Sequence, residues 1–195
     1  MASKNFFDFK SQLAFYGEYH NNPINQLIHI VFVPTIVWTV LVWTSLLGEV
    51  LPHPAFLPAW LELHPGWIIA TVAYGIYFII LEPMAGLVAA LFYQCLWASA
   101  CYFVSWQIST GANNHIAIAS VLHIISWTFQ FLGHGVAEKR KPTLLDNVGQ
   151  AFLLAPFFVV IEVLFKLGYR PALAKEFQLE VDSRISAWKA SKKQD

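Results

Sequence analysis

Histidine is the residue type of this chain that could do chemistry, because its placement is unusual. All seven histidines lie between Lys10 and Lys139, and this stretch contains no Lys or Arg. A polar ring in hydrocarbon is costly unless it has a partner or a function. Four histidines stand inside or beside long apolar runs, namely His20, His29, His123 and His134. Neutral imidazoles with few carboxylates nearby suit Fe(II), Zn(II) or Cu, so these four are candidate metal ligands.

The residues around His20 and His29 predict that the two rings can meet. Asn22 can cap a helix, and Pro23 fits its first turn, where a missing N–H costs nothing. Asn25 and His29 are then one turn apart on one face of that helix. Because His20 precedes the helix, the chain can fold it back towards His29. For any single ring, a cap or an interfacial position is the alternative.

His123 lies in the middle of the apolar run from Ile116 to Leu132, where an ionisable group favours a functional hypothesis. His134 follows that run and stands one turn before Glu138. Eleven residues separate His123 from His134, which is about 16 Å on an unbroken helix. One ion could bind both rings only if the helix unwound near Gly133, and two ions are the alternative.

The remaining candidates for chemistry are few. We expect His53, His64 and His115 to be solvated loop residues or helix caps. Glu18 and Glu138 are the carboxylates that could complete an iron triad. The chain lacks the HxxxH and HxxHH boxes of membrane di-iron enzymes, and it lacks HExxH and GxSxG. These absences disfavour a desaturase, an intramembrane zinc protease and a serine hydrolase.

The composition places the histidines in a membrane protein. The chain is 57% hydrophobic and 12% charged, which is too apolar for a soluble domain of 195 residues. Five apolar segments predict helices: Leu27 to Leu47, Trp67 to Leu81, Met84 to Trp106, Ile116 to Leu132 and Ala151 to Leu167. The first four are expected to cross the bilayer, with a tight hairpin at Glu82-Pro83 between the second and third. The fifth contains Pro156 and Glu162, so we expect a re-entrant or interfacial segment.

The predicted fold class is therefore all-α, an integral membrane helical bundle that forms a single domain over residues 1–195. Residues 1–26 precede the membrane core at 27–167, and residues 168–195 form a tail. That tail carries an apolar stripe, which predicts an amphipathic C-terminal helix on the membrane surface: Leu173, Phe177, Val181, Ile185 and Trp188. Cys95 and Cys101 are expected to be buried thiols. The net charge is zero without a basic face, so nucleic acid is not an expected partner, whereas the lipid bilayer is.

Three sequence stretches resemble one known family. They are YHNNPINQLIHIVFVP from Tyr19 to Pro34, WTFQFLGHGVAEKRKP from Trp127 to Pro142, and LLDN from Leu144 to Asn147, with APF at Ala155 to Phe157. Together they resemble the fungal endoplasmic-reticulum 2-hydroxy fatty acid dioxygenases, which are small multi-pass membrane proteins. The resemblance covers nearly the whole chain.

The resemblance implies an Fe(II)-dependent α-oxidation, in which a 2-hydroxy fatty acid and O₂ give the acid one carbon shorter, as in phytosphingosine degradation. It implies that His20, His29, His123 and His134 are the functional positions. Asn25, Gln130 and Glu138 also match the motif, as substrate-binding residues or as residues that support the histidines. The substrate can supply all four electrons that O₂ needs, so neither 2-oxoglutarate nor a nicotinamide is required. Arg140 and its basic neighbours could bind the substrate anion or serve only as a topology signal.

Two other classes of function remain open. One is a non-catalytic membrane scaffold or lipid-binding protein whose histidines bond across helices. The other is a proton-coupled transporter with His123 as a relay, although the chain has no inverted repeat.

The basic residues predict the topology. Two precede the first apolar run, three follow the fourth, and seven end or follow the fifth. Four crossings put all three groups on one side, which the positive-inside tendency makes the cytoplasm. A glycosylation acceptor engineered between residues 48 and 66 is expected to be modified in microsomes, and one in the C-terminal tail is not. Modification of the tail would mean five crossings.

Overall fold

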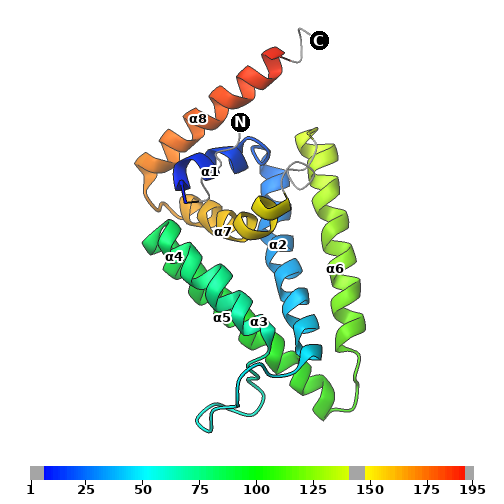
Figure 1. The fold of residues 1–195 in the computed structure, drawn as a ribbon. Coiled ribbons are helices and arrows are strands. Elements are labelled where there is room, and N and C mark those ends of the chain that lie inside the picture. The colour runs from blue at the N-terminus through cyan, green and yellow to red at the C-terminus, as the bar shows by residue number, and fades with distance from the viewer. Residues whose placement is uncertain (1–6, 141–147, 192–195) are drawn as a thin grey trace. The chain divides into compact units, whose positions relative to one another are not determined.

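The computed structural model describes residues 7–140 and 148–191, with side chains from residue 152 onward in the second range. These residues form helices, turns and loops, with no strand among them (Figure 1). The all-helical prediction is confirmed. The basic residues Lys4, Lys141, Lys192 and Lys193 and the LLDN stretch lie outside the described residues. The chain divides into two compact units, Val31–Phe129 and the pair Met1–Ile30 with Gln130–Asp195.

The unit Val31–Phe129 contains the apolar helices. It holds most of α2 (Pro23–Thr44) and α6 (His115–Leu132), together with the short 3₁₀ turn η1 (Ser45–Leu47) and α5 (Pro83–Ser109). A further helical run from Pro65 to Leu81 consists of α3 (Pro65–Ile68), the π-helical η2 (Ile69–Ile76) and α4 (Tyr77–Leu81). These helices lie within a few residues of the four apolar runs predicted from the sequence.

The predicted hairpin at Glu82-Pro83 is confirmed. Glu82 has extended backbone angles that end α4, and its carboxylate accepts a bond from the Ala85 N–H at 2.6 Å, which caps α5. The run from Pro65 to Leu81 then packs antiparallel to α5 (Figure 1). The backbones of the two helices are in close contact at Gly86. A Cβ at this position would collide with the carbonyl of Phe78, so the contact requires glycine.

His64 is a helix cap, which is one of the two roles predicted for it, but it is buried and not solvated. It does cap the helix that begins at Pro65, since its Nδ1 accepts from the Gly66 N–H at 3.1 Å. Its ring is only 1% exposed, however, and Nε2–H faces the Cys101 sulfur at 3.2 Å. Burial lowers the pKa of His64. The neutral imidazole therefore links the loop to α5 through Cys101, and its Nδ1 also lies 3.0 Å from the Thr44 hydroxyl at the end of α2.

Three helices are long and apolar enough to cross a membrane: Pro23–Leu47, Pro83–Ser109 and His115–Glu138. The run Pro65–Leu81 is shorter and apolar. α7 (Val148–Lys166) and α8 (Pro171–Ser191) are separated by a bend of 119°. The described residues thus contain three candidate spanning segments, or four if the bent pair α7 and α8 counts as one, and both the four crossings and the re-entrant placement of α7 stay predictions.

The other unit surrounds the N-terminal histidines. It contains α1 (Phe9–Gly17), the start of α2, the π-helical turn η3 (Gly133–Glu138), α7 and α8. α7 is a continuous helix with Pro156 inside it, and it buries an apolar face together with Glu162. α8 packs against α1 (Figure 1) and buries Leu173 and Val181. Part of the stripe predicted to rest on the membrane surface therefore packs within the protein.

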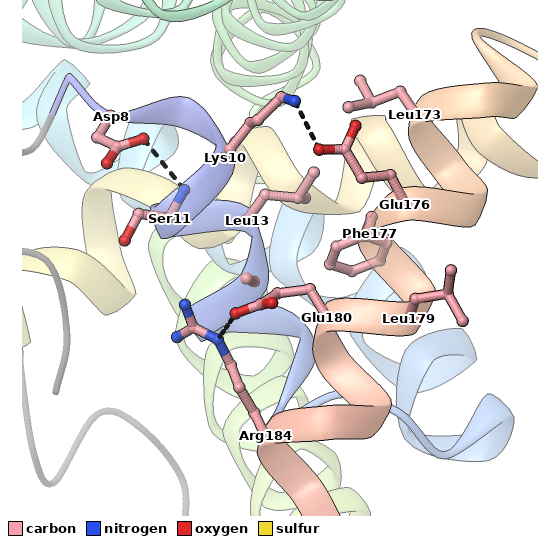
Figure 2. Close-up of a pocket in the computed structure, with 11 residues that line it drawn as sticks. Asp8, Lys10, Ser11, Leu13, Leu173, Glu176, Phe177, Leu179, Glu180 and Arg184 are labelled. Atoms are coloured by element: carbon pink, nitrogen blue, oxygen red, sulfur yellow. Dashed lines mark hydrogen bonds and ion pairs between the residues drawn. The ribbon is translucent and has the colours of Figure 1, made fainter.

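A groove of about 450 Å³ is lined by residues of α1 and α8. Figure 2 shows these side chains. Lys10 bridges the two helices through Glu176 at 2.7 Å, and Arg184 pairs with Glu180 of its own helix. The charged lining holds three carboxylates, including Asp8, against these two paired cations. This balance does not suit the anionic end of a fatty acid.

Candidate metal centre

His20 lies in the non-helical segment 18–22 that follows α1. Its Nδ1 lies 2.9 Å from the carbonyl of Tyr16, to which it donates as an N–H. The ring also stacks on the Tyr16 ring, with centroids 3.9 Å apart. The chain thereby folds His20 back towards α2, as the position of Pro23 predicted.

His29 is carried by the first turns of α2. The Asn22 side chain caps that helix by accepting from the Ile24 N–H at 2.9 Å, which confirms the predicted helix start. His29 Nδ1 donates to the carbonyl of Asn25 at 2.9 Å. For both His20 and His29, the proton on Nδ1 leaves Nε2 with its lone pair.

His134 lies in the π-helical turn η3, which directly follows α6. Turns of this kind widen a helix and are frequent at functional sites. The turn approaches α2 closely at Gly133, where a Cβ would collide with Asn25 Oδ1 and lie 3.3 Å from Ile28 Cδ1. Only glycine leaves room for this approach.

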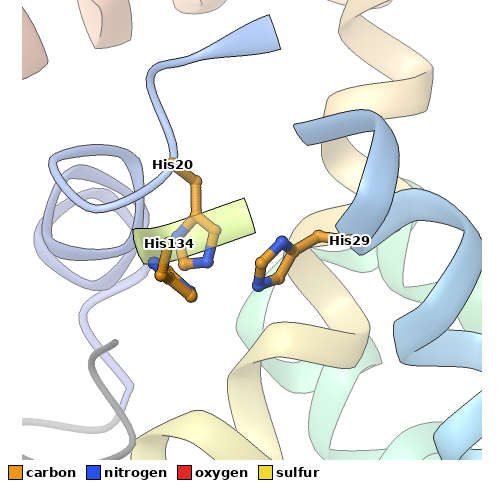
Figure 3. A group of neighbouring side chains, drawn as sticks. All are labelled: His20, His29 and His134. Carbon is orange, nitrogen blue, oxygen red and sulfur yellow. The ribbon is translucent and has the colours of Figure 1, made fainter. Parts of the chain in front are cut away.

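The three rings converge on one point (Figure 3). The ring centroids are 4.3 Å apart for His20 and His29, and 4.8 Å apart for each of these rings and His134. One nitrogen from each ring lies within 4.8 Å of the others, and all three residues are buried. Among the described residues, His20, His29 and His134 form a group whose nitrogens are close enough together to hold one metal ion.

Two nitrogens in this cluster have no hydrogen-bond partner, namely His20 Nε2 and His134 Nδ1. Leaving a buried polar atom unpaired costs about 1–3 kcal/mol. A metal ion fits the cluster because it would take up these lone pairs. The Nδ1 bonds of His20 and His29 to backbone carbonyls are also the arrangement that orients metal-binding imidazoles.

The electrostatics of the cluster favour neutral rings. Burial lowers the pKa of His20 well below its usual value, and the neighbouring His29 and His134 and the positive Arg140 lower it further. The ring is thus in the form that can ligate a metal. Three neutral imidazoles are compatible with iron, zinc or copper.

Glu138 holds the segment that carries His20. Its carboxylate accepts bonds from the backbone N–H groups of Asn21 at 3.2 Å and Asn22 at 2.9 Å, and from Asn25 Nδ2 at 3.3 Å. Arg140 donates to the Glu18 carbonyl at 2.7 Å and approaches its carboxylate at 3.4 Å. Neither Glu18 nor Glu138 belongs to the three-histidine group, and both support the loop instead.

Asn25 and Gln130 contribute unpaired polar atoms to this unit. Asn25 Nδ2 donates to the Tyr19 carbonyl, whereas its Oδ1 is buried without a partner. Gln130 Nε2 is also buried and unpartnered. An unpaired acceptor and an unpaired donor of this kind can bind the polar end of a ligand.

His123 is not part of the three-histidine group. The Trp127 indole N–H donates to its Nε2 at 2.9 Å, so the ring proton is on Nδ1. Nδ1–H donates to Thr39 Oγ1 at 2.7 Å, and that hydroxyl donates to the Ile36 carbonyl. Both nitrogens of His123 are therefore in use within the unit Val31–Phe129.

Tyr16, Tyr19 and Trp188 were not among the site residues predicted from the sequence. Arg140 lies 3.7 Å from the centre of the Tyr19 ring and 4.7 Å from that of Trp188. Only Tyr16 had a signal, since it stands four residues before His20 and supplies its carbonyl.

These features define a class of protein, an all-helical chain with membrane-length apolar helices and a buried trio of histidines that could hold a metal. Residues 6–167 match the family described as "2-hydroxy-palmitic acid dioxygenase Mpo1-like". The chain is also 35% identical, over 179 residues, to the 2-hydroxy-palmitic acid dioxygenase MPO1 of Saccharomyces cerevisiae, covering 91% of this chain and 92% of the yeast protein. The chain belongs to this family. No solved structure matches it.

Two neighbouring glycines test the close approach of η3 to α2. Gly133→Ala is expected to weaken Fe(II) or Co(II) binding by about tenfold or more, because its methyl group displaces Asn25 and with it His29. Gly135→Ala is the control, since a Cβ there meets no atom within 4 Å. Equal affinities of the two purified variants would show that the approach does not set the histidine geometry.

Proposed function

We propose that this protein is an Fe(II)-dependent dioxygenase that converts a 2-hydroxy fatty acid and O₂ into the fatty acid one carbon shorter, CO₂ and water. The buried cluster with unpaired His20 Nε2 and His134 Nδ1 carries the proposal, because it fits a metal in a helical membrane protein. The family match and the name of the yeast relative support the substrate class.

The reaction balances without a co-substrate. Oxidation of the hydroxyl-bearing carbon to a carboxyl group and release of the old carboxyl as CO₂ give up four electrons, which reduce one O₂. A bound Fe(II) would supply the redox chemistry that lets O₂ react, together with a Lewis-acid contact for the hydroxy-carboxylate.

The residues of the chain have separable roles in this proposal. His20, His29 and His134 would hold the metal through neutral nitrogens. Gln130 Nε2 would donate to the substrate carboxylate, and Asn25 Oδ1 would accept from its hydroxyl, because both atoms are buried and unpaired. Glu138 and Arg140 would fix the segment that carries His20.

The same geometry disfavours a scaffold. Histidines that only join helices would have both nitrogens in hydrogen bonds, as His123 does with Thr39 and Trp127. The trio instead leaves buried nitrogens without partners.

The proposed location is the endoplasmic-reticulum membrane, with both termini in the cytoplasm. The apolar helices support a membrane setting, and the resemblance supports the organelle and a role in phytosphingosine breakdown. The acyl chain would then lie along the helices within the bilayer.

Oxygen uptake tests the reaction. In anaerobically purified protein loaded with Fe(II), 2-hydroxypalmitate is expected to consume one O₂ per acid shortened, without consumption of 2-oxoglutarate or NADPH. Palmitate is expected to be a poor substrate, because it lacks the hydroxyl that supplies two of the electrons. One-to-one consumption of 2-oxoglutarate, or equal turnover of palmitate, would contradict the proposed chemistry.

Metal content tests the ligand set. His123→Ala is expected to keep its bound iron, because the ring already uses both nitrogens in hydrogen bonds. His29→Ala is expected to lose iron, and His53→Ala serves as the control in the loop. Loss of iron from a folded His123→Ala protein would return His123 to the ligand set.

A further inference from the structure

The segment that carries His20 follows α1 as a turn, in which the amides of Tyr19 and His20 donate to carbonyls at the end of α1. Residues 18–22 lie between α1 and α2 and are not helical. They are held by side chains from other elements, namely Glu138 on the amides of Asn21 and Asn22, and Arg140 on the carbonyl of Glu18. These two side chains therefore help to set the position of the His20 ring, together with its own contacts to Tyr16.

Arg140 is itself fixed between two aromatic rings. Its guanidinium carbon lies 3.7 Å from the centre of the Tyr19 ring and 4.7 Å from that of Trp188. The side chain is only 9% exposed. A planar guanidinium stacks well on aromatic faces, and the attraction grows as the pair is removed from water.

Trp188 belongs to α8, which lies beyond the region matched by the family, residues 6–167. α8 has two further contacts with the part of the chain that leads to His20. Gln178 Nε2 donates to Asn21 Oδ1 at 2.9 Å. The side chains of Phe177 and Val181 fill the space over Gly17, where a Cβ would lie 2.5 and 2.6 Å from them.

The buried side of α8 thus faces the histidine segment. Val181 is 1% exposed and Leu173 is 7% exposed, whereas Leu179 on another side is 63% exposed. A helix used only to rest on a lipid surface would keep its apolar stripe free for lipid. Here part of that stripe, Leu173 and Val181, is already buried against protein.

We propose that α8 positions the metal centre, with Trp188 acting on His20 through Arg140. The proposal rests on the proposed function, since it assumes that the three histidines bind a metal. Trp188 is a positioning residue here, because it would act on His20 through the guanidinium of Arg140.

Co(II) titration of the full-length protein tests this role, because its visible absorption bands report both the affinity and the ligand geometry. Trp188→Ala is expected to weaken Co(II) binding about three- to tenfold, which is the range of one partly buried cation–π contact, and to change the bands. Trp188→Phe keeps an aromatic face and is expected to restore most of the affinity. Leu179→Ala, which removes an exposed apolar side chain of the same helix, is expected to match the wild type in affinity and bands.

A double-mutant cycle separates this route from a general loss of stability. If Trp188 acts through Arg140, Trp188→Ala adds little to the effect of Arg140→Ala. Additive effects, or unchanged Co(II) binding in Trp188→Ala, would overturn the positioning role while the metal centre stands. A wild-type protein that binds neither Co(II) nor Fe(II) would overturn the proposed function and this inference together.

Discussion

The burial of three imidazoles, two of which have an unpaired nitrogen, is the constraint on which the site depends. The rings lie 4.3–4.8 Å apart, and they are almost fully removed from water. Each unpaired nitrogen costs free energy that the fold recovers only when a ligand takes up the lone pair. The hydrogen bonds of the surrounding unit therefore have to offset the free-energy cost of burying these polar rings.

The supporting charges show how this is achieved. Glu138 and Arg140 are two residues apart, and each binds a different end of the segment 18–22. Neither side chain belongs to the three-histidine group, although the positive charge of Arg140 is close enough to lower the pKa of His20. The Glu138 carboxylate accepts hydrogen bonds from backbone amides. The Arg140 guanidinium donates to a carbonyl and lies over two aromatic rings. The unit thus keeps its charges close to the cluster without placing one inside it.

Local patterns predicted a large part of the fold. The apolar runs gave the helices to within a few residues, and the Asn22-Pro23 and Glu82-Pro83 pairs marked boundaries that the capping bonds confirm. The meeting of His20 and His29 also followed from the position of Pro23. These features depend on residues close together in the chain, so spacing alone can indicate them.

The features that the sequence did not predict depend on contacts between residues far apart in the chain. The convergence of His134 with the other two rings requires a π-helical turn, whose sequence differs little from that of an α-helix. The burial of His64 depends on Cys101, which lies 37 residues away. Arg140 was a candidate for binding substrate, yet its guanidinium lies between Tyr19 and Trp188, far apart in sequence. The spacing of residues within one segment cannot predict such contacts, because they form only when separate helices pack together.

The π-helical turn also makes the length of the chain part of the site. Each of its hydrogen bonds spans one residue more than in an α-helix. A chain one residue shorter between His134 and Glu138 would turn Glu138 by about 100° around the helix axis relative to the histidine. The carboxylate could then no longer reach the amides of Asn21 and Asn22 while His134 faced the trio. The exposed Val136 can vary in type, but the number of residues in this turn cannot.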